Sequence, residues 1–104
     1  MSNKIRLDFR VLIYREDEFW IAHCLETDLV AEGETLSQAL DSLIDISNVQ
    51  IKAALEEGDL ASVFSPAPAE IWRMYAVAAE GPSRRPRKAL KQVNKISVRQ
   101  FATA

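Results

Sequence analysis

The chain has 104 residues, of which 48% are hydrophobic and 27% charged, a balance that fits one small globular domain with a single core. No apolar run approaches the ~20 residues needed to cross a bilayer, and the N-terminus lacks an apolar signal segment, so we expect a cytoplasmic protein that does not enter membranes. The single cysteine, Cys24, excludes an internal disulfide, and no Cys/His cluster indicates a metal site.

The net charge of −2 conceals an uneven distribution along the chain. Residues 1–80 carry 6 basic and 15 acidic side chains, whereas residues 81–104 carry 7 basic and no acidic ones. We therefore divide the chain into an α+β body, residues 1–80, and a basic tail, residues 81–104. The acidic body favours a basic partner. The tail could attract phosphate groups, or fold back on the acidic body of its own or a sister chain.

A regular alternation of apolar and polar residues predicts the first strand, with one buried face: Ile5, Leu7, Phe9, Val11 and Ile13. The charged residues 15–18 are few enough to make an antiparallel hairpin with a second strand over residues 19–24. Residues 26–28 have turn composition and precede a short third strand over residues 29–31. The first part of the chain is therefore predicted to be an antiparallel meander.

A long helix is predicted to begin after Thr35 and to end at Gly58. Thr35 and Gln38 have the spacing of a capping box, and Gly58 supplies the left-handed residue that commonly ends a helix. The main apolar face is formed by residues at helical spacing: Leu36, Ala39, Leu40, Leu43, Ile44, Ile51, Ala54 and Leu55. Three further apolar residues widen this face: Ile46, Val49 and Ala53.

The second strand, the turn and the start of the long helix resemble the HicB-like antitoxin domain. The matching segments are WIAHC, the acidic turn LETD and GETLSQA, which follows the family's Gly-x-Thr-x-x-x-Ala pattern. The likeness covers roughly residues 5–58, and Leu25 stands where the family usually has a proline. The resemblance implies a partial ribonuclease-H-like fold and a role in neutralising HicA, a small basic ribonuclease.

A second element follows Pro66 and Pro68. It is predicted to be a short helix running to about Ala79, with an edge strand as the alternative. We expect this helix to pack on the widened face of the long helix. The resulting fold class is α+β: a three- to four-stranded antiparallel sheet packed on one long helix, with a second short helix. Because such a sheet leaves an apolar face open, we also expect a homo-oligomer.

The basic run over residues 84–88 is predicted to be a solvated linker, and regular structure resumes near Val93. Alternation over residues 95–99 predicts a fourth strand that pairs with the sheet of its own or a neighbouring chain. It is also similar to the strand that opens the ribbon-helix-helix domain of many HicB-like antitoxins, although no helices follow it here. In that alternative, nucleic acid would contact the basic side chains of Arg84, Arg85, Arg87, Lys88, Lys91, Lys95 and Arg99.

Some residues of the sequence are types used in acid-base catalysis or in metal-dependent nucleases. His23, Glu26 and Asp28 could form an acid-base group, but no nucleophile motif or phosphate loop accompanies them, and a histidine on a sheet more often packs. A metal-dependent nuclease would need converging carboxylates, and nothing in the sequence brings together the candidates Asp8, Asp28, Asp41 and Asp45. We therefore expect a protein without enzymatic activity, metal or cofactor.

Binding is the function that these patterns favour. The resemblance implies an antitoxin, or an orphan relative, that covers a HicA-type ribonuclease, and the acidic body suits a basic partner because complementary charge speeds encounter. The candidate contacts are Glu26, Asp28, Glu32 and Glu34, although each of these carboxylates also fits an ordinary solvated rim. The alternative is a nucleic-acid-associated regulator that uses the basic tail.

Overall fold

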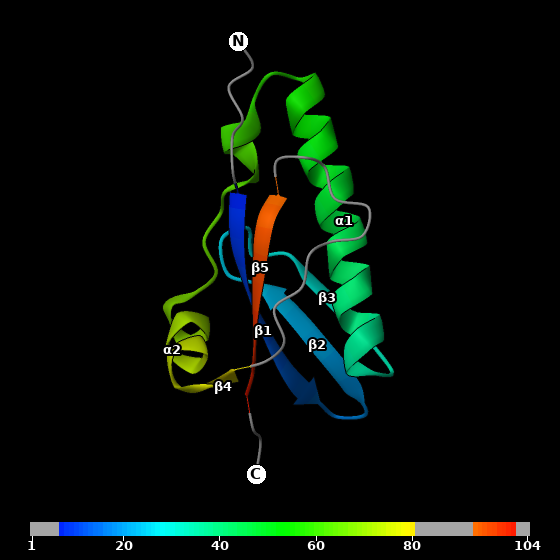
Figure 1. Ribbon diagram of the computed structural model, residues 1–104, viewed down its shortest axis with the longest axis vertical. Helices are drawn as coiled ribbons and strands as arrows, with labels where there is room; N and C mark the ends of the chain where they lie inside the picture. The colour runs from blue at the N-terminus through cyan, green and yellow to red at the C-terminus, as the bar shows by residue number, and fades with distance from the viewer. Residues whose placement is uncertain (1–6, 81–92, 102–104) are drawn as a thin grey trace.

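A computed structural model describes residues 7–80 and 93–101 of the chain. The elements along the chain are β1 (Leu7–Glu16), β2 (Phe19–Cys24), β3 (Val30–Gly33), α1 (Leu36–Glu56), the 3-10 helix η1 (Leu60–Val63), α2 (Ala69–Val77), β4 (Ala79–Glu80) and β5 (Val93–Gln100) (Figure 1). The fold is α+β, as predicted. No helix in the described ranges is long and apolar enough to span a membrane.

The sheet has the order β3-β2-β1-β5-β4, in which β4 contributes only two residues. The meander is confirmed, since β1 pairs antiparallel with β2 and β2 with β3. The expected fourth strand is β5, which pairs with the sheet of its own chain. It runs parallel to β1, so the sheet is mixed rather than wholly antiparallel. A parallel neighbour requires a long crossover connection, which the chain supplies between β1 and β5.

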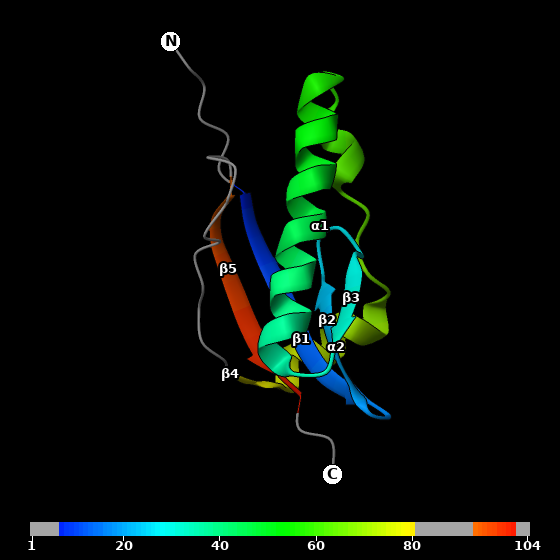
Figure 2. The ribbon, with the colours of Figure 1, turned by 90° about the vertical axis from the view of Figure 1, so that its right-hand side faces the viewer.

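One face of the sheet packs against α1 (Figure 2). The alternate residues of β1 that point to this face are buried, and β5 contributes Ile96 and Val98 to the same core. The buried members of the core are Leu7, Phe9, Val11, Ile13, Ala22, Cys24, Ala39, Leu40, Leu43, Ile51, Ile96 and Val98. Burial of each large aliphatic side chain contributes about 1.5–3 kcal/mol, so residues near both ends of the chain stabilise one core.

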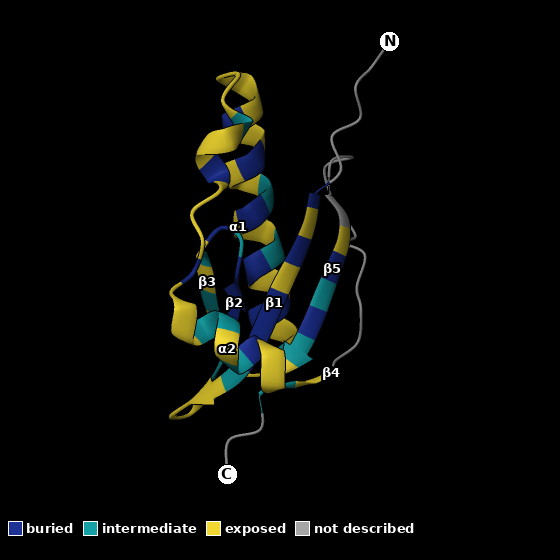
Figure 3. Cartoon of the chain, turned by 90° about the vertical axis from the view of Figure 1, so that its left-hand side faces the viewer, coloured by how far each residue is buried: buried dark blue, intermediate teal, exposed yellow. Residues whose placement is uncertain are grey.

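The opposite face of the sheet is covered by α2 (Figure 3). The helix prediction for this segment is confirmed, but α2 ends at Val77, and Ala79 belongs to β4. The expected packing of α2 on the widened face of α1 is wrong, because α2 packs instead on Leu12 of β1 and on Leu25, the residue after β2. The backbone amides of Ser65 and Ala67 donate to carbonyls of the β2–β3 turn, which leads the chain onto this face.

The start and end of α1 follow the predicted capping residues. The amide of Gln38 donates to Thr35 Oγ1 at 3.1 Å, as in a capping box. The return hydrogen bond differs, since Gln38 Oε1 accepts from the amide of Glu34, also at 3.1 Å. At the other end, Gly58 has a φ of 69°, the left-handed conformation that glycine adopts without steric cost.

Gly33 joins β3 to α1 at a point where no side chain fits. A Cβ atom placed there would lie 2.5 Å from Ala39 N and 2.8 Å from Gln38 Cβ. Both atoms belong to the first turns of α1, and Ala39 is fully buried against the sheet. The Gly33, Thr35 and Ala39 pattern therefore positions the helix: the glycine allows close approach, the threonine caps the helix, and the alanine keeps the contact small.

Replacing Gly33 with alanine should destabilise the fold by about 1–3 kcal/mol, because the added methyl group overpacks the junction. Gly58→Ala is the matched control. Its Cβ would meet nothing within 4 Å, so only the strain of a positive φ remains, about 1 kcal/mol. Urea unfolding followed by circular dichroism measures both free energies. A smaller loss for Gly33→Ala than for Gly58→Ala would contradict the close approach at Gly33.

Candidate functional site

One continuous segment of the chain carries an unbalanced negative charge. Residues 16–51 contain nine acidic side chains and no lysine or arginine. Eight of the nine belong to exposed residues: Glu16, Asp17, Glu18, Asp28, Glu32, Glu34, Asp41 and Asp45. Residues 16–51 build β2, β3 and most of α1, which lie together on the side of the molecule away from β4 (Figure 1). The three exposed carboxylates along β3, those of Asp28, Glu32 and Glu34, form what we call the acidic edge.

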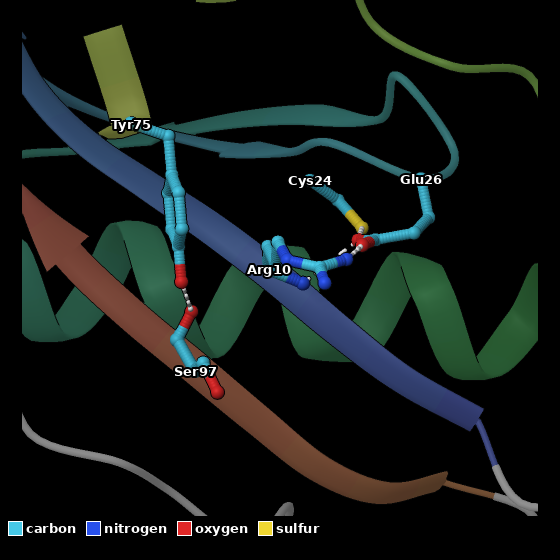
Figure 4. A network of polar contacts seen from close by, with 5 residues as sticks. All are labelled: Arg10, Cys24, Glu26, Tyr75 and Ser97. Atoms are coloured by element: carbon cyan, nitrogen blue, oxygen red, sulfur yellow. Dashed lines mark hydrogen bonds and ion pairs between the residues drawn. The ribbon is translucent and has the colours of Figure 1, made fainter. Parts of the chain in front are cut away.

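Glu26, the fourth predicted contact, is held by the chain itself. Its carboxylate accepts a hydrogen bond from the backbone amide of Arg10 at 2.7 Å and forms an ion pair with the Arg10 guanidinium at 2.6 Å (Figure 4). Only 13% of the Glu26 side chain is exposed. Glu26 thus fixes the β2–β3 turn to β1 instead of extending toward solvent. No local sequence pattern indicates this pair, because its two members are 16 residues apart.

His23 and Asp28 hold the same turn through a second side-chain contact. His23 Nε2 lies 2.7 Å from Asp28 Oδ1, and Asp28 adopts a φ of 59°, which aspartate tolerates better than most residues. His23 itself is only 6% exposed. Its Nδ1 is buried and has no hydrogen-bond partner within the described residues. Neither ring nitrogen is thus open to a substrate, which favours a structural role for His23.

Cys24 is buried in the core beneath α1. Burial is the main cause that raises the pKa of its thiol, and the carboxylate of Glu26 raises it further against the hydrogen bonds from Thr27. The thiol Sγ lies 3.9 Å from Glu26 Oε1, a weak contact at most. A protonated, enclosed thiol is a poor nucleophile, so the side chain acts as a small apolar group of the core.

The acidic residues considered for a metal site lie on separate elements. Asp8 is on β1, Asp28 is in the β2–β3 turn, and Asp41 and Asp45 are on α1. Within residues 7–80 and 93–101, no three His, Cys, Asp or Glu side chains come together in a group that could hold a metal ion.

The structure describes two of the seven basic side chains predicted to contact nucleic acid. Arg84, Arg85, Arg87, Lys88 and Lys91 lie outside the described residues, as does the predicted linker. On β5, Lys95 is exposed. Arg99 instead donates to the Tyr75 carbonyl at 3.0 Å and lies over the Tyr75 ring, so it fastens α2 to the sheet. The nucleic-acid role stays a prediction.

Tyr75 joins α2 to β5 in a second way, which the sequence did not indicate. Its hydroxyl donates to the Ser97 carbonyl at 3.4 Å (Figure 4). Trp72 lies one turn earlier on α2. The Arg10 guanidinium carbon lies over the Trp72 ring, 5.7 Å from the ring centroid. The basic side chains of Arg10 and Arg99 are therefore paired within the fold, on the face of the sheet that α2 covers.

Comparisons with protein-family models, with curated proteins and with solved structures found no match to this chain. The candidate site therefore rests on the residues and contacts described above.

The enclosed thiol of Cys24 should react with a thiol reagent at pH 8 about 100-fold more slowly in the folded protein than in urea. The pKa of the Cys24 thiol is higher in the folded protein than in the unfolded chain. The stability that this difference contributes is therefore complete below the unfolded pKa of about 8.5 and is lost as the pH rises through the folded pKa. Chemical unfolding of the native chain and of Cys24→Ala across this pH range measures the difference. Rapid labelling of the folded protein would contradict a buried thiol.

Proposed function

We propose that this protein is a HicB-like antitoxin, or an orphan relative of that family, which binds and neutralises a small basic ribonuclease of HicA type. The observation that carries the proposal is the charge of residues 16–51: nine acidic side chains, eight of them on exposed residues, and no lysine or arginine. Such a surface attracts a cationic protein over several ångströms and disfavours nucleic acid.

The positions of the resemblance motifs support the same proposal. The WIAHC segment is β2 with Cys24 at its end, the acidic turn joins β2 to β3, and Gly33, Thr35 and Ala39 build the start of α1. These residues act in the fold itself, so a protein that shares them is expected to share the meander and the helix. The enclosed His23 and Cys24 favour binding over catalysis.

Charge mimicry explains how binding would inhibit the ribonuclease. An enzyme that cleaves RNA presents cationic side chains to the phosphates of its substrate. The carboxylates of the acidic edge can pair with those same cations, and the bound antitoxin then excludes RNA from them. Both the complex and the inhibition should weaken as salt is added, because exposed charges are screened within about 8–10 Å near physiological ionic strength.

The test uses the small basic ribonuclease encoded beside this gene, purified and mixed with the full chain. The native chain should suppress RNA cleavage at near-equimolar ratio. The double variant Glu32→Lys/Glu34→Lys should weaken inhibition at least about tenfold, because it places positive charge on the acidic edge. Titration of cleavage against antitoxin concentration gives the inhibition constants.

Glu56→Lys/Glu57→Lys is the matched control, since both residues are exposed and the net charge changes equally, but at the far end of α1. It should weaken inhibition less than about threefold. A missing neighbouring ribonuclease, or full RNA cleavage in the presence of the native chain, would refute the antitoxin proposal.

We also propose that the chain forms a homo-oligomer through the flank of α1. The apolar face of the sheet that the sequence predicts to be open is covered by α2. Among the exposed apolar residues, Ile46 and Val49 lie less than one turn apart on α1, where they are 39% and 70% exposed. Exposed aliphatic residues side by side on a helix are a common feature of subunit contacts.

Val49→Glu should shift the protein toward monomer, because a charge would be buried in the contact. Val77→Glu is the control: Val77 is 77% exposed but lies on α2, so its substitution should leave the mass unchanged. Light scattering coupled to size exclusion at several concentrations measures the mass. A native chain that is monomeric at the highest concentration would contradict self-association.

A further inference from the structure

β3 is the outermost strand of the described sheet, so one of its two edges faces away from the sheet. A strand edge of this kind presents backbone N–H and C=O groups that another extended chain can pair with. β3 has four residues, Val30–Gly33, and α1 packs on one of its faces. An added strand would therefore extend the sheet beside α1 rather than stand free.

The alternation of hydrogen bonds between β2 and β3 identifies which backbone groups of β3 point away from the sheet. The amide of Cys24 donates to the carbonyl of Leu29 at 2.9 Å, so the N–H of Cys24 points toward the β3 side of β2. Because the direction of the backbone groups alternates along a strand, Ala22 and Trp20 also point toward β3 and form hydrogen-bonded pairs with Ala31 and Gly33. Val30 and Glu32, which flank Ala31, thus point their N–H and C=O groups away from β2.

The side chains of the same two residues define the chemistry of the edge. Val30 is 47% exposed and Glu32 is exposed, and both lie on the face of the sheet opposite α1, because Ala31 packs against the α1 core. Asp28 and Glu34 are exposed just before and just after the strand. An incoming strand would thus meet one apolar side chain and three carboxylates.

A second copy of β3 is a poor occupant of this edge. Two β3 strands related by a two-fold axis, with Val30 of each copy opposite Glu32 of the other, would place Asp28 of one copy opposite Glu34 of the other, and like charges on adjacent strands destabilise pairing. A strand with lysine or arginine at alternate positions would instead place positive charge beside Glu32 and toward the carboxylates at both ends.

We propose that the outer edge of β3 receives an extended basic segment of the partner protein as an additional strand, paired through the backbone of Val30 and Glu32. This inference rests on the proposed function, in which the partner is a small basic ribonuclease. Backbone pairing fixes the position and direction of the incoming strand, and the surrounding carboxylates select a basic sequence.

Two substitutions at one position separate the backbone contribution from the charge. Glu32→Pro removes the outward N–H and the charge together, while leaving the pairs of Ala31 and Gly33 with β2 intact, since proline is tolerated on an edge strand. Glu32→Gln removes the charge alone. Affinity for the neighbouring ribonuclease, measured by calorimetry, should fall at least about tenfold more for Glu32→Pro than for Glu32→Gln. Equal losses for the two variants overturn the inference.

Amide hydrogen exchange on the unsubstituted protein gives a test that does not depend on the folding of a variant. When the ribonuclease binds, the amides of Val30 and Glu32 should exchange at least about tenfold more slowly. If the ribonuclease is inhibited but these two amides keep their exchange rates, the inference fails and the antitoxin function stands.

If the ribonuclease neither binds nor is inhibited, the proposed function fails, and a synthetic peptide then decides the inference. The probe is the capped heptapeptide Lys-Val-Lys-Val-Lys-Val-Lys, with Glu-Val-Glu-Val-Glu-Val-Glu as its control. Saturable shifts of the Val30 and Glu32 amide resonances with the basic peptide alone support the edge site. Their absence, or equal shifts with the acidic peptide, overturns it.

Discussion

Gly33 and the first turns of α1 approach so closely that only a hydrogen atom fits between them. This contact fixes where the helix begins relative to β3, and the position of the helix then decides which sheet residues it buries. Thr35 and Gln38 add the capping hydrogen bonds at the same junction. Because Glu32 and Glu34 flank Gly33, the junction that forms the core also determines how the carboxylates of the acidic edge are presented to solvent.

The central strand β1 is buried from both sides. α1 covers Val11 and Ile13, whereas α2 covers Leu12. The neighbouring strand β2 is enclosed in the same way, so His23 and Cys24 lose access to solvent. The ion pair of Arg10 and Glu26 ties the turn after β2 back to β1. The contact between His23 Nε2 and Asp28 Oδ1 holds the carboxylate of Asp28 at the same turn.

Under this proposal, charge and backbone pairing contribute differently to recognition of the partner at the acidic edge. Long-range attraction between the acidic side and a basic partner raises the rate of encounter but specifies no orientation. Backbone pairing acts only at hydrogen-bond distance and specifies one register and one direction. A four-residue strand offers few backbone groups, so it gains from the carboxylates around it, and in the absence of a basic partner those same charges discourage pairing between copies of the chain.

Local patterns in the sequence determined the meander, the start of α1 at Thr35, its end at Gly58, the helical state of residues 69–77 and the strand near the end of the chain. Each depends on hydrogen bonds or periodicity within a few residues, which the sequence displays directly. Only the tertiary structure decided that β5 runs parallel to β1, that α2 covers the sheet instead of α1, and that Glu26 pairs with Arg10 while Glu32 stays exposed. These outcomes depend on which apolar faces and charged groups meet across distant parts of the chain, and no local pattern of residues encodes such a meeting.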